Sequence, residues 1–284
     1  LQTEDEISAG FAIFGAVLAG QRAFTATAGP GHILMQDALS MAEGMRLPFV
    51  EIVGMRGGPS SGTVIYSQQE VNLACFGGNG EGLRLVYSPS NLDELYRFTV
   101  RAFNDAWKYR FPAIVLTDGY LLKTNGIFKN NKKHKKINTK LLVESGDTVH
   151  LPSIYALEEE LYKKLLQDKK DYDKIKVATA ESFKTDDAKI LIIAHGIVGA
   201  AAKQAVIELR KQNKKVGLFR PITLRPFAEK KLNQLAGKVK QIIIIESSFG
   251  QLEKIVRGEL DSKIKVEISG LYYPALGIEP EMII

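Results

Sequence analysis

The chain has 284 residues, of which 45% are hydrophobic and 25% charged, a composition typical of a globular protein with one large or two ordinary domains. Its single cysteine excludes a disulfide framework and any iron–sulfur cluster or zinc site built from cysteines of this chain, and it fits a reducing, cytoplasmic compartment. No apolar run is long enough to cross a bilayer, so we expect no membrane association.

The formal net charge of +6 is not evenly spread along the chain. A lysine-rich run covers residues 129–140 and contains no aromatic residue. This pattern predicts a solvated loop and no nucleic-acid site, which would need a basic face with interleaved aromatics.

Residues 1–128 alternate apolar strand patterns with amphipathic helix patterns. Helices are predicted at 7–19, 32–43, 71–75 and 92–109, and strands at 23–27, 49–53, 83–87 and 113–116. The helix at 92–109 is the best marked, because Asn91 can cap its start and Pro112 stops it. Such alternation predicts an α/β domain with a mostly parallel sheet covered on both faces. Since Leu1 lies in an apparent strand-to-helix junction, we expect this domain to be truncated at its N-terminus.

Residues 129–185 are polar and lysine-rich, and they predict a connector with peripheral elements, including a helix at 153–166. Residues 186–284 resume the α/β pattern. Strands are predicted at 189–194, 216–219, 241–245 and 264–268, helices at 200–211, 229–236 and 251–260, and a loop at 220–227. The predicted fold is therefore two doubly wound, mostly parallel-sheet α/β domains, at 1–128 and 186–284.

Three acids, Glu4, Asp5 and Glu6, stand at the start of the first helix. One interpretation is favourable charge at a helix N-terminus, where the macrodipole stabilises acids. The other is a carboxyl group directed at a ligand nitrogen, because the small residues of this helix allow close packing behind it. The residues alone leave both interpretations open.

Two glycine-rich segments follow predicted strands. Gly29-Pro30-Gly31 is either an ordinary strand-to-helix turn or a place where the backbone approaches a flat ligand. Arg56 opens a loop of small residues through Gly62, either a flexible surface loop or a site where a bidentate arginine binds a carboxylate.

Other motifs give weaker evidence for a functional site. The run 77–82 has four glycines but lacks the Lys-Ser/Thr of a phosphate-binding loop, and Asn79 stands where a magnesium-binding acid would be needed. His195 and Glu246 each follow a predicted strand of the second domain and are more simply turn or interface residues. The chain has no G-x-S-x-G, H-E-x-x-H or C-x-x-C motif, so hydrolase and metalloenzyme readings lose support.

Together these motifs resemble the alpha subunit of 2-oxoacid:ferredoxin oxidoreductases. The 56–62 loop is similar to the family's Arg-x-Gly-Pro-Ser-Thr-Gly sequence. Further matches are residues 4–6 before Gly15-Ala16, 25–31, 100–118 and, in the second domain, 220–227. Departures are Ala28 for Ser, Ser61 for Thr, Gln68-Gln69-Glu70 for Gln-Gly-Asp, and Asn79 for His. The last two bear on substrate choice more than on fold.

The resemblance implies that residues 1–128 form a pyrimidine-binding domain for thiamine diphosphate and residues 186–284 a transketolase C-terminal-like domain. By spacing from Gly15-Ala16, Glu6 matches the family's catalytic glutamate, whose carboxyl would bind N1′ of the aminopyrimidine. Gly29, Pro30 and Gly31 would lie beside the cofactor, and Arg56 would bind the carboxylate of the 2-oxoacid.

The resemblance also implies that this chain holds no metal. Mg²⁺, the cofactor diphosphate and a 4Fe–4S cluster would belong to a partner beta subunit. The pair would convert a 2-oxoacid and coenzyme A into acyl-CoA and CO₂ while reducing ferredoxin. Two alternatives remain: a non-oxidative thiamine enzyme of the transketolase or 2-oxoacid dehydrogenase type, and a non-catalytic assembly paralogue.

Overall fold

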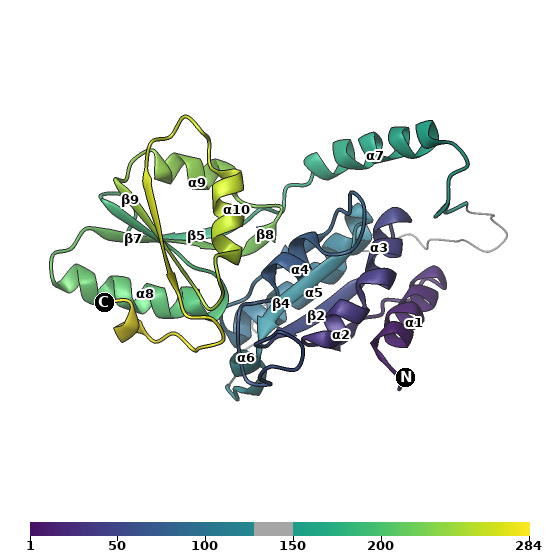
Figure 1. Ribbon diagram of the computed structural model, residues 1–284, viewed down its shortest axis with the longest axis horizontal. Coiled ribbons are helices and arrows are strands. Elements are labelled where there is room, and N and C mark those ends of the chain that lie inside the picture. Colours follow the sequence, from purple (N-terminus) through teal and green to yellow (C-terminus); the bar gives the residue numbers. More distant parts are fainter. Residues whose placement is uncertain (128–149) are drawn as a thin grey trace.

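A computed structural model describes residues 1–127 and 150–284, and the lysine-rich run at 129–140 lies outside these ranges. The described chain forms two α/β units that lie side by side, with the N-terminus on the first and the C-terminus on the second (Figure 1). Each unit is built on a five-stranded, mostly parallel sheet. The predicted fold class is therefore confirmed.

The first sheet has the strand order β1-β2-β4-β3-β8. Its four parallel strands are β1 (Thr25–Thr27), β2 (Val50–Met55), β4 (Ala113–Asp118) and β3 (Leu85–Tyr87). The fifth, β8 (Thr223–Arg225), comes from the second half of the chain and pairs antiparallel with β3. It lies in the segment predicted as a loop, so that prediction is wrong at these three residues.

Helices cover both faces of the first sheet. On one face α5 (Leu92–Tyr109) packs through Phe98, Ala102 and Ala106 on alternate residues of the strands. On the other face lie α1 (Glu6–Leu18), α3 (Gln36–Gly44) and α4 (Val71–Phe76). The short helices α2 (Pro30–Leu34) and α6 (Gly119–Lys123) follow β1 and β4 directly. The single helix predicted at 32–43 is thus two helices that meet at Met35.

The predicted connector contributes more than peripheral elements. Its helix, α7, spans Glu158–Asp173 rather than 153–166, and its end docks on the first unit. There the Tyr172 hydroxyl donates to the carbonyl of Arg84 at 2.7 Å, and its ring meets Phe111 edge to face. A strand absent from the prediction, β5 (Ala180–Phe183), forms the edge of the second sheet.

The second sheet has the order β10-β9-β6-β7-β5, with only β5 antiparallel to its neighbour. Its other strands are β6 (Ile190–Ile193), β7 (Val216–Pro221), β9 (Gln241–Glu246) and β10 (Glu267–Tyr272). Helix α8 (Gly196–Lys211) covers one face, and α9 (Glu229–Ala236) and α10 (Gln251–Glu259) cover the other. A 3₁₀ turn at Pro280–Met282 packs near α8.

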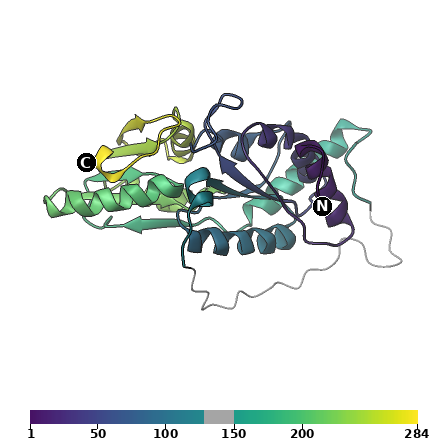
Figure 2. The same ribbon diagram turned by 90° about the horizontal axis from the view of Figure 1, so that it is seen from below.

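The two units share a core and a buried ion pair. The apolar cluster of α1, α3 and α4 continues without a break into the α9 and α10 side of the second unit. Arg220 of β7 donates from Nη2 to Oε1 of Glu94 on α5 at 2.6 Å and from Nη1 to Oε2 at 3.0 Å. Both side chains are less than 10% exposed, so this pair fixes the units against each other. Figure 2 shows the same two units from below.

Candidate active site

The candidate site lies at the carboxyl ends of β1 and β2, which are adjacent and parallel. Strand β1 ends at Thr27 and leads into Ala28-Gly29-Pro30-Gly31, here called the 28–31 turn. Strand β2 ends at Met55 and leads directly into Arg56. Ligands of open α/β sheets bind at this edge, so the topology alone brings the turn and the arginine to one place.

Glu6 is the acid that reaches the turn. It is the first residue of α1 and is half-buried, whereas Glu4 and Asp5 are exposed. A Cβ built on Gly31 would lie 2.6 Å from Cγ and 2.8 Å from Cδ of Glu6, so only glycine lets this carboxyl lie against the turn. Among the described residues, the Glu6 carboxylate has no hydrogen bond or ion pair.

The helix-cap interpretation holds for Asp5 instead. Its Oδ1 accepts the backbone N–H of Ser8 at 2.7 Å, which lowers the carboxyl pKa below its ordinary value. The acids at the start of α1 therefore have different roles: Asp5 caps the helix, and Glu6 extends toward Gly31.

Arg56 lies on the other side of the same turn. A Cβ on Gly29 would lie 3.1 Å from Cζ of Arg56 and closer still to Nε. Gly29 also has φ of +57°, a conformation that favours glycine. The Nε atom of Arg56 is buried without a hydrogen-bond partner in the part of the chain that the structure describes. Hence Glu6 and Arg56 lie against two glycines of one turn, and within residues 1–127 and 150–284 neither charged group is paired.

The loop after Arg56 is less open than its composition suggests. The backbone N–H of Gly58 donates to Oε1 of Gln69 at 2.8 Å, and the N–H of Thr63 donates to the carbonyl of Gly57 at 2.9 Å. These two hydrogen bonds hold the loop at both ends. The guanidinium of Arg56 has no hydrogen bond among the described residues.

Glu70 lies in the Gln68-Gln69-Glu70 departure from the family's motif, and the structure gives it a role that the sequence did not reveal. Its Oε1 accepts the N–H of Gly29 at 2.9 Å and its Oε2 accepts the N–H of Arg56 at 3.0 Å, so one carboxylate joins the two halves of the site. Burial raises its pKa, although both hydrogen bonds and the charges of His32 and Arg56 oppose the rise. The motif match gave no hint of its hydrogen-bond partners, which lie 41 and 14 residues away.

A buried His–Glu pair lies behind the turn and was also missed. His32, which follows Gly31, has Nδ1 at 2.8 Å from Oε1 of Glu51 on β2, and both side chains are fully buried. The pair ties α2 to the middle of the sheet and so fixes where the turn leaves β1.

The remaining sequence candidates have structural roles. The 77–82 run wraps around Arg84, whose guanidinium donates to the carbonyl of Gly77 and to both carboxylate oxygens of Glu43. His195 hydrogen-bonds Ser88 through Nδ1 at 2.8 Å, and burial lowers its pKa to about 3. Glu246 accepts the N–H groups of Leu252 and Glu253 at the start of α10.

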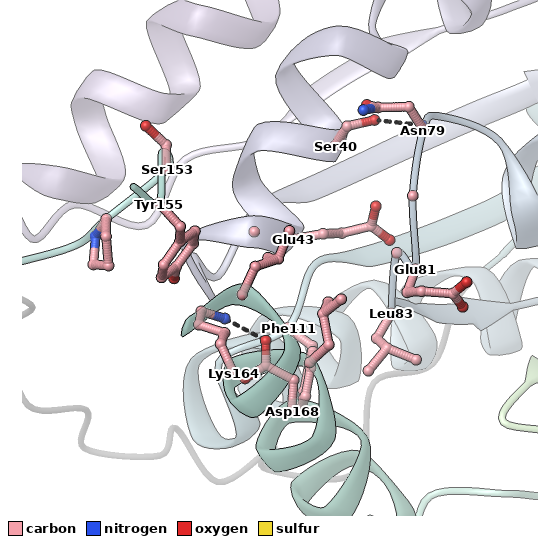
Figure 3. A pocket seen from close by; sticks show the side chains of 16 residues that line it. Ser40, Glu43, Asn79, Glu81, Leu83, Phe111, Ser153, Tyr155, Lys164 and Asp168 are labelled. Atoms are coloured by element: carbon pink, nitrogen blue, oxygen red, sulfur yellow. Dashed lines mark hydrogen bonds and ion pairs between the residues drawn. The ribbon is translucent and has the colours of Figure 1, made fainter. Parts of the chain in front are cut away.

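A separate pocket of about 220 Å³ lies between α3, α7 and the glycine-rich run (Figure 3). Ser40, Asn79, Tyr155 and Lys164 are among its lining side chains, and no residue of the candidate site lines it. Two of its acids are paired: Glu43 binds Arg84, and Asp168 binds Arg46 and Lys164.

Comparison with known proteins shows the family of this chain. Residues 1–185 match the family "Pyruvate flavodoxin/ferredoxin oxidoreductase, thiamine diP-bdg", and residues 188–277 match "Pyruvate:ferredoxin oxidoreductase core domain II". The chain therefore belongs to the 2-oxoacid:ferredoxin oxidoreductase family. The family inferred from the motifs is confirmed, as is its place among oxidoreductase subunits.

The names of the curated relatives refer to different 2-oxoacids. The ketoisovalerate oxidoreductase subunit VorB of Methanothermobacter thermautotrophicus is 33% identical over 90% of this chain and 75% of its own length. The 2-oxoglutarate synthase subunit KorA of Methanocaldococcus jannaschii is 32% identical over 89% of this chain and 76% of its own. Relatives of nearly equal identity thus act on different 2-oxoacids.

Solved structures show the same fold. The 2-oxoglutarate:ferredoxin oxidoreductase of Magnetococcus marinus, solved with 2-oxoglutarate, coenzyme A and succinyl-CoA, superposes with a TM-score of 0.83 at 26% identity. It covers all of this chain, which spans 55% of the length of that one. A split-gene transketolase superposes at 0.61 with 13% identity over 94% of this chain and 72% of its own, which is a likeness of fold alone. Within residues 1–127 and 150–284, no helix is long and apolar enough to cross a membrane.

Proposed function

We propose that this family member is an alpha-type subunit that acts with a beta subunit. The pair would oxidatively decarboxylate a 2-oxoacid to acyl-CoA and CO₂ and pass the electrons to ferredoxin. One observation carries the proposal: Glu6 packs against Gly31 and Arg56 packs against Gly29 of the same turn. Relatives of this family support the reaction class, and their names span ketoisovalerate and 2-oxoglutarate.

The residues present fit the aminopyrimidine half of thiamine diphosphate. Glu6 offers a carboxylate without a protein partner among the described residues, and Gly31 beside it has no side chain to block a flat ring. Glu6 would hold a hydrogen bond at N1′ of that ring and so govern a proton shared between them. When bound, thiamine diphosphate would supply the carbon nucleophile and the electron sink for decarboxylation.

Arg56 fits the carboxylate that every 2-oxoacid carries. Its guanidinium is planar and can bind a carboxylate through two parallel hydrogen bonds. The backbone of Arg56 is fixed by Glu70 and its side chain by Gly29, so the cation has a set position before substrate arrives. The residue would orient the 2-oxoacid with its carbonyl toward the cofactor.

The beta subunit would supply Mg²⁺, the diphosphate site and a 4Fe–4S cluster. The only cysteine of this chain, Cys75, is buried, and burial raises its pKa to about 12, so this chain cannot ligate such a cluster. A partner also fits the exposed apolar side chains beside Glu6. Ile7 and Phe11 of α1 and Ile33 and Leu34 of α2 are each 38–57% exposed.

The test is co-expression with a cognate beta subunit, followed by anaerobic assay of methyl viologen reduction. We expect reduction that requires both coenzyme A and one of pyruvate, 2-oxoglutarate, ketoisovalerate or an aryl 2-oxoacid. Absence of turnover in a complex that contains thiamine diphosphate and a reducible cluster would contradict the proposal. In that case an assembly role would be favoured, and turnover without an electron acceptor would favour a non-oxidative enzyme.

A further inference from the structure

Residues Gln68-Gln69-Glu70, here called the 68–70 segment, run between the two α/β units just before α4. Gln68 is fully buried and Glu70 is 7% exposed. Every side chain of the segment accepts a backbone N–H from a distant part of the chain. Such buried polar contacts are costly to leave unpaired, so the segment is held in one arrangement.

One side of the segment is bound by the second unit. The N–H of Gln68 donates to the carbonyl of Ser247 at 3.2 Å, and its Oε1 accepts the N–H of Ser247 at 3.1 Å. Its Nε2 also donates to the carbonyl of His195 at 3.0 Å. Gln251 adds a bond from its Nε2 to the carbonyl of Gln69 at 2.8 Å.

The other side of the segment is bound to the candidate site. Gln69 accepts the N–H of Gly58, one residue beyond Gly57 in the loop that Arg56 opens. Glu70 accepts the N–H groups of Gly29 and Arg56 with its two oxygens. The pairing of β1 with β2 ends at Thr27 and Val53 in the described residues. Beyond these two residues the Glu70 carboxylate joins the chain that follows β1 to the chain that follows β2.

We propose that Glu70 is a positioning residue: it sets the separation between the 28–31 turn and Arg56, and the second unit holds it in place through Gln68, Gln69 and Gln251. This inference rests on the proposed function, since it assigns the spacing of the cofactor and 2-oxoacid subsites. Glu70 touches neither group. It acts through two backbone amides, and the second unit thereby contributes to the site through its hydrogen bonds to the 68–70 segment.

Glu70→Gln is the main test, measured in the assembled complex with beta subunit. Glutamine has nearly the same shape as glutamate but has one acceptor oxygen instead of two. The N–H of either Gly29 or Arg56 would therefore face the NH₂ group of the glutamine. Losing one hydrogen bond to a charged acceptor corresponds to a change of about 10- to 100-fold in a binding constant. We expect the KM for the 2-oxoacid and the dissociation constant for thiamine diphosphate to rise by that factor together, with kcat changed less.

Glu43→Gln is the matched control. Glu43 is equally buried in the same unit and binds Arg84, but it contacts neither Gly29 nor Arg56. We expect it to lower the melting temperature and leave both constants at the wild-type value. A Glu70→Gln complex that behaves like this control, less stable but with wild-type constants, would overturn the proposal.

A second variant keeps the test decisive if Glu70→Gln does not assemble. Gln251→Ala removes the bond to Gln69 from the second unit, together with the acceptor for the N–H of Asn72 at the start of α4. We expect a rise of a few-fold in the KM for the 2-oxoacid, and an unchanged KM would contradict the link between units. A wild-type complex without turnover points instead to failure of the proposed function, so the two failures are distinguishable.

Discussion

The two α/β units have the same architecture but treat polar groups at their strand ends differently. In the second unit, Glu246 ends β9 and caps α10 by accepting the N–H groups of Leu252 and Glu253, so its charge is satisfied within the protein. In the first unit, Arg56 follows β2 and Glu6 begins α1 beside the turn that follows β1, and neither charged group has a hydrogen bond among the described residues. Equal architecture with unequal pairing separates a structural edge from a ligand-binding edge.

This contrast between paired and unpaired charged groups predicts how variants of each kind should behave. Changes at groups that are paired away from the 68–70 segment, such as Glu246 or the Arg220–Glu94 pair, should alter stability and leave substrate constants alone. Changes at Glu6 or Arg56 should alter catalysis and leave stability alone.

The largest expected stability effect is at the pair between the units. Arg220→Met leaves Glu94 buried without its cation and should cost about 3–5 kcal/mol of unfolding free energy. The KM for the 2-oxoacid should not change in complexes that assemble. Urea denaturation checks the first part, and the double variant Arg220→Met/Glu94→Leu should recover part of the loss. If the single variant instead raises KM with no loss of stability, the pair belongs to the site.

Acid stability tests His195. Burial lowers its pKa to about 3, so the native state keeps it neutral, while the unfolded chain binds a proton below its ordinary value of 6.5. The stability it contributes is therefore present above pH 6.5 and is lost as pH falls toward 3. Between pH 7.5 and 4.5 the loss is about 3 kcal/mol. His195→Gln should flatten this part of the pH dependence in urea titrations, and an unchanged slope would contradict the assignment.

A smaller effect in free energy is expected at Arg56. Arg56→Lys keeps the charge but loses the planar fork, so the KM for the 2-oxoacid should rise by about 10- to 100-fold with an unchanged melting temperature. Arg97→Lys is the control, because Arg97 is an exposed arginine paired with Asp93 on α5. Steady-state kinetics of both variants decide the point. Equal constants for the two would mean that Arg56 does not bind substrate.

Much of the fold follows from local signals. Helices α5 and α9 have the predicted bounds, and α5 does so because Asn91 accepts the N–H of Glu94 at its start and Pro112 ends it. Strands β5 and β8 were missed because each is short and is defined by pairing with a distant strand. Long-range pairing leaves no local pattern in a stretch of three or four residues.

The site residues likewise fall into those that the sequence could predict and those that it could not. Glu6, the 28–31 turn and Arg56 could be proposed from sequence because acids, glycines and an arginine beside predicted strands are visible there. The sequence marked Glu70 only as part of a departure from the family's motif and did not mark the His32–Glu51 pair at all, since the roles of these residues depend on contacts that only the folded chain creates. Sequence thus indicates the groups that meet a ligand more readily than those that position them.

The most direct test of the central claim compares Glu6→Gln with Glu4→Gln in the assembled complex. Glu6 packs on Gly31 and Glu4 is exposed, although both are acids at the start of α1. We predict that Glu6→Gln lowers kcat by about 100-fold or more while the complex still assembles, and that Glu4→Gln retains wild-type kcat. Full activity in Glu6→Gln together with loss of activity in Glu4→Gln would contradict the account.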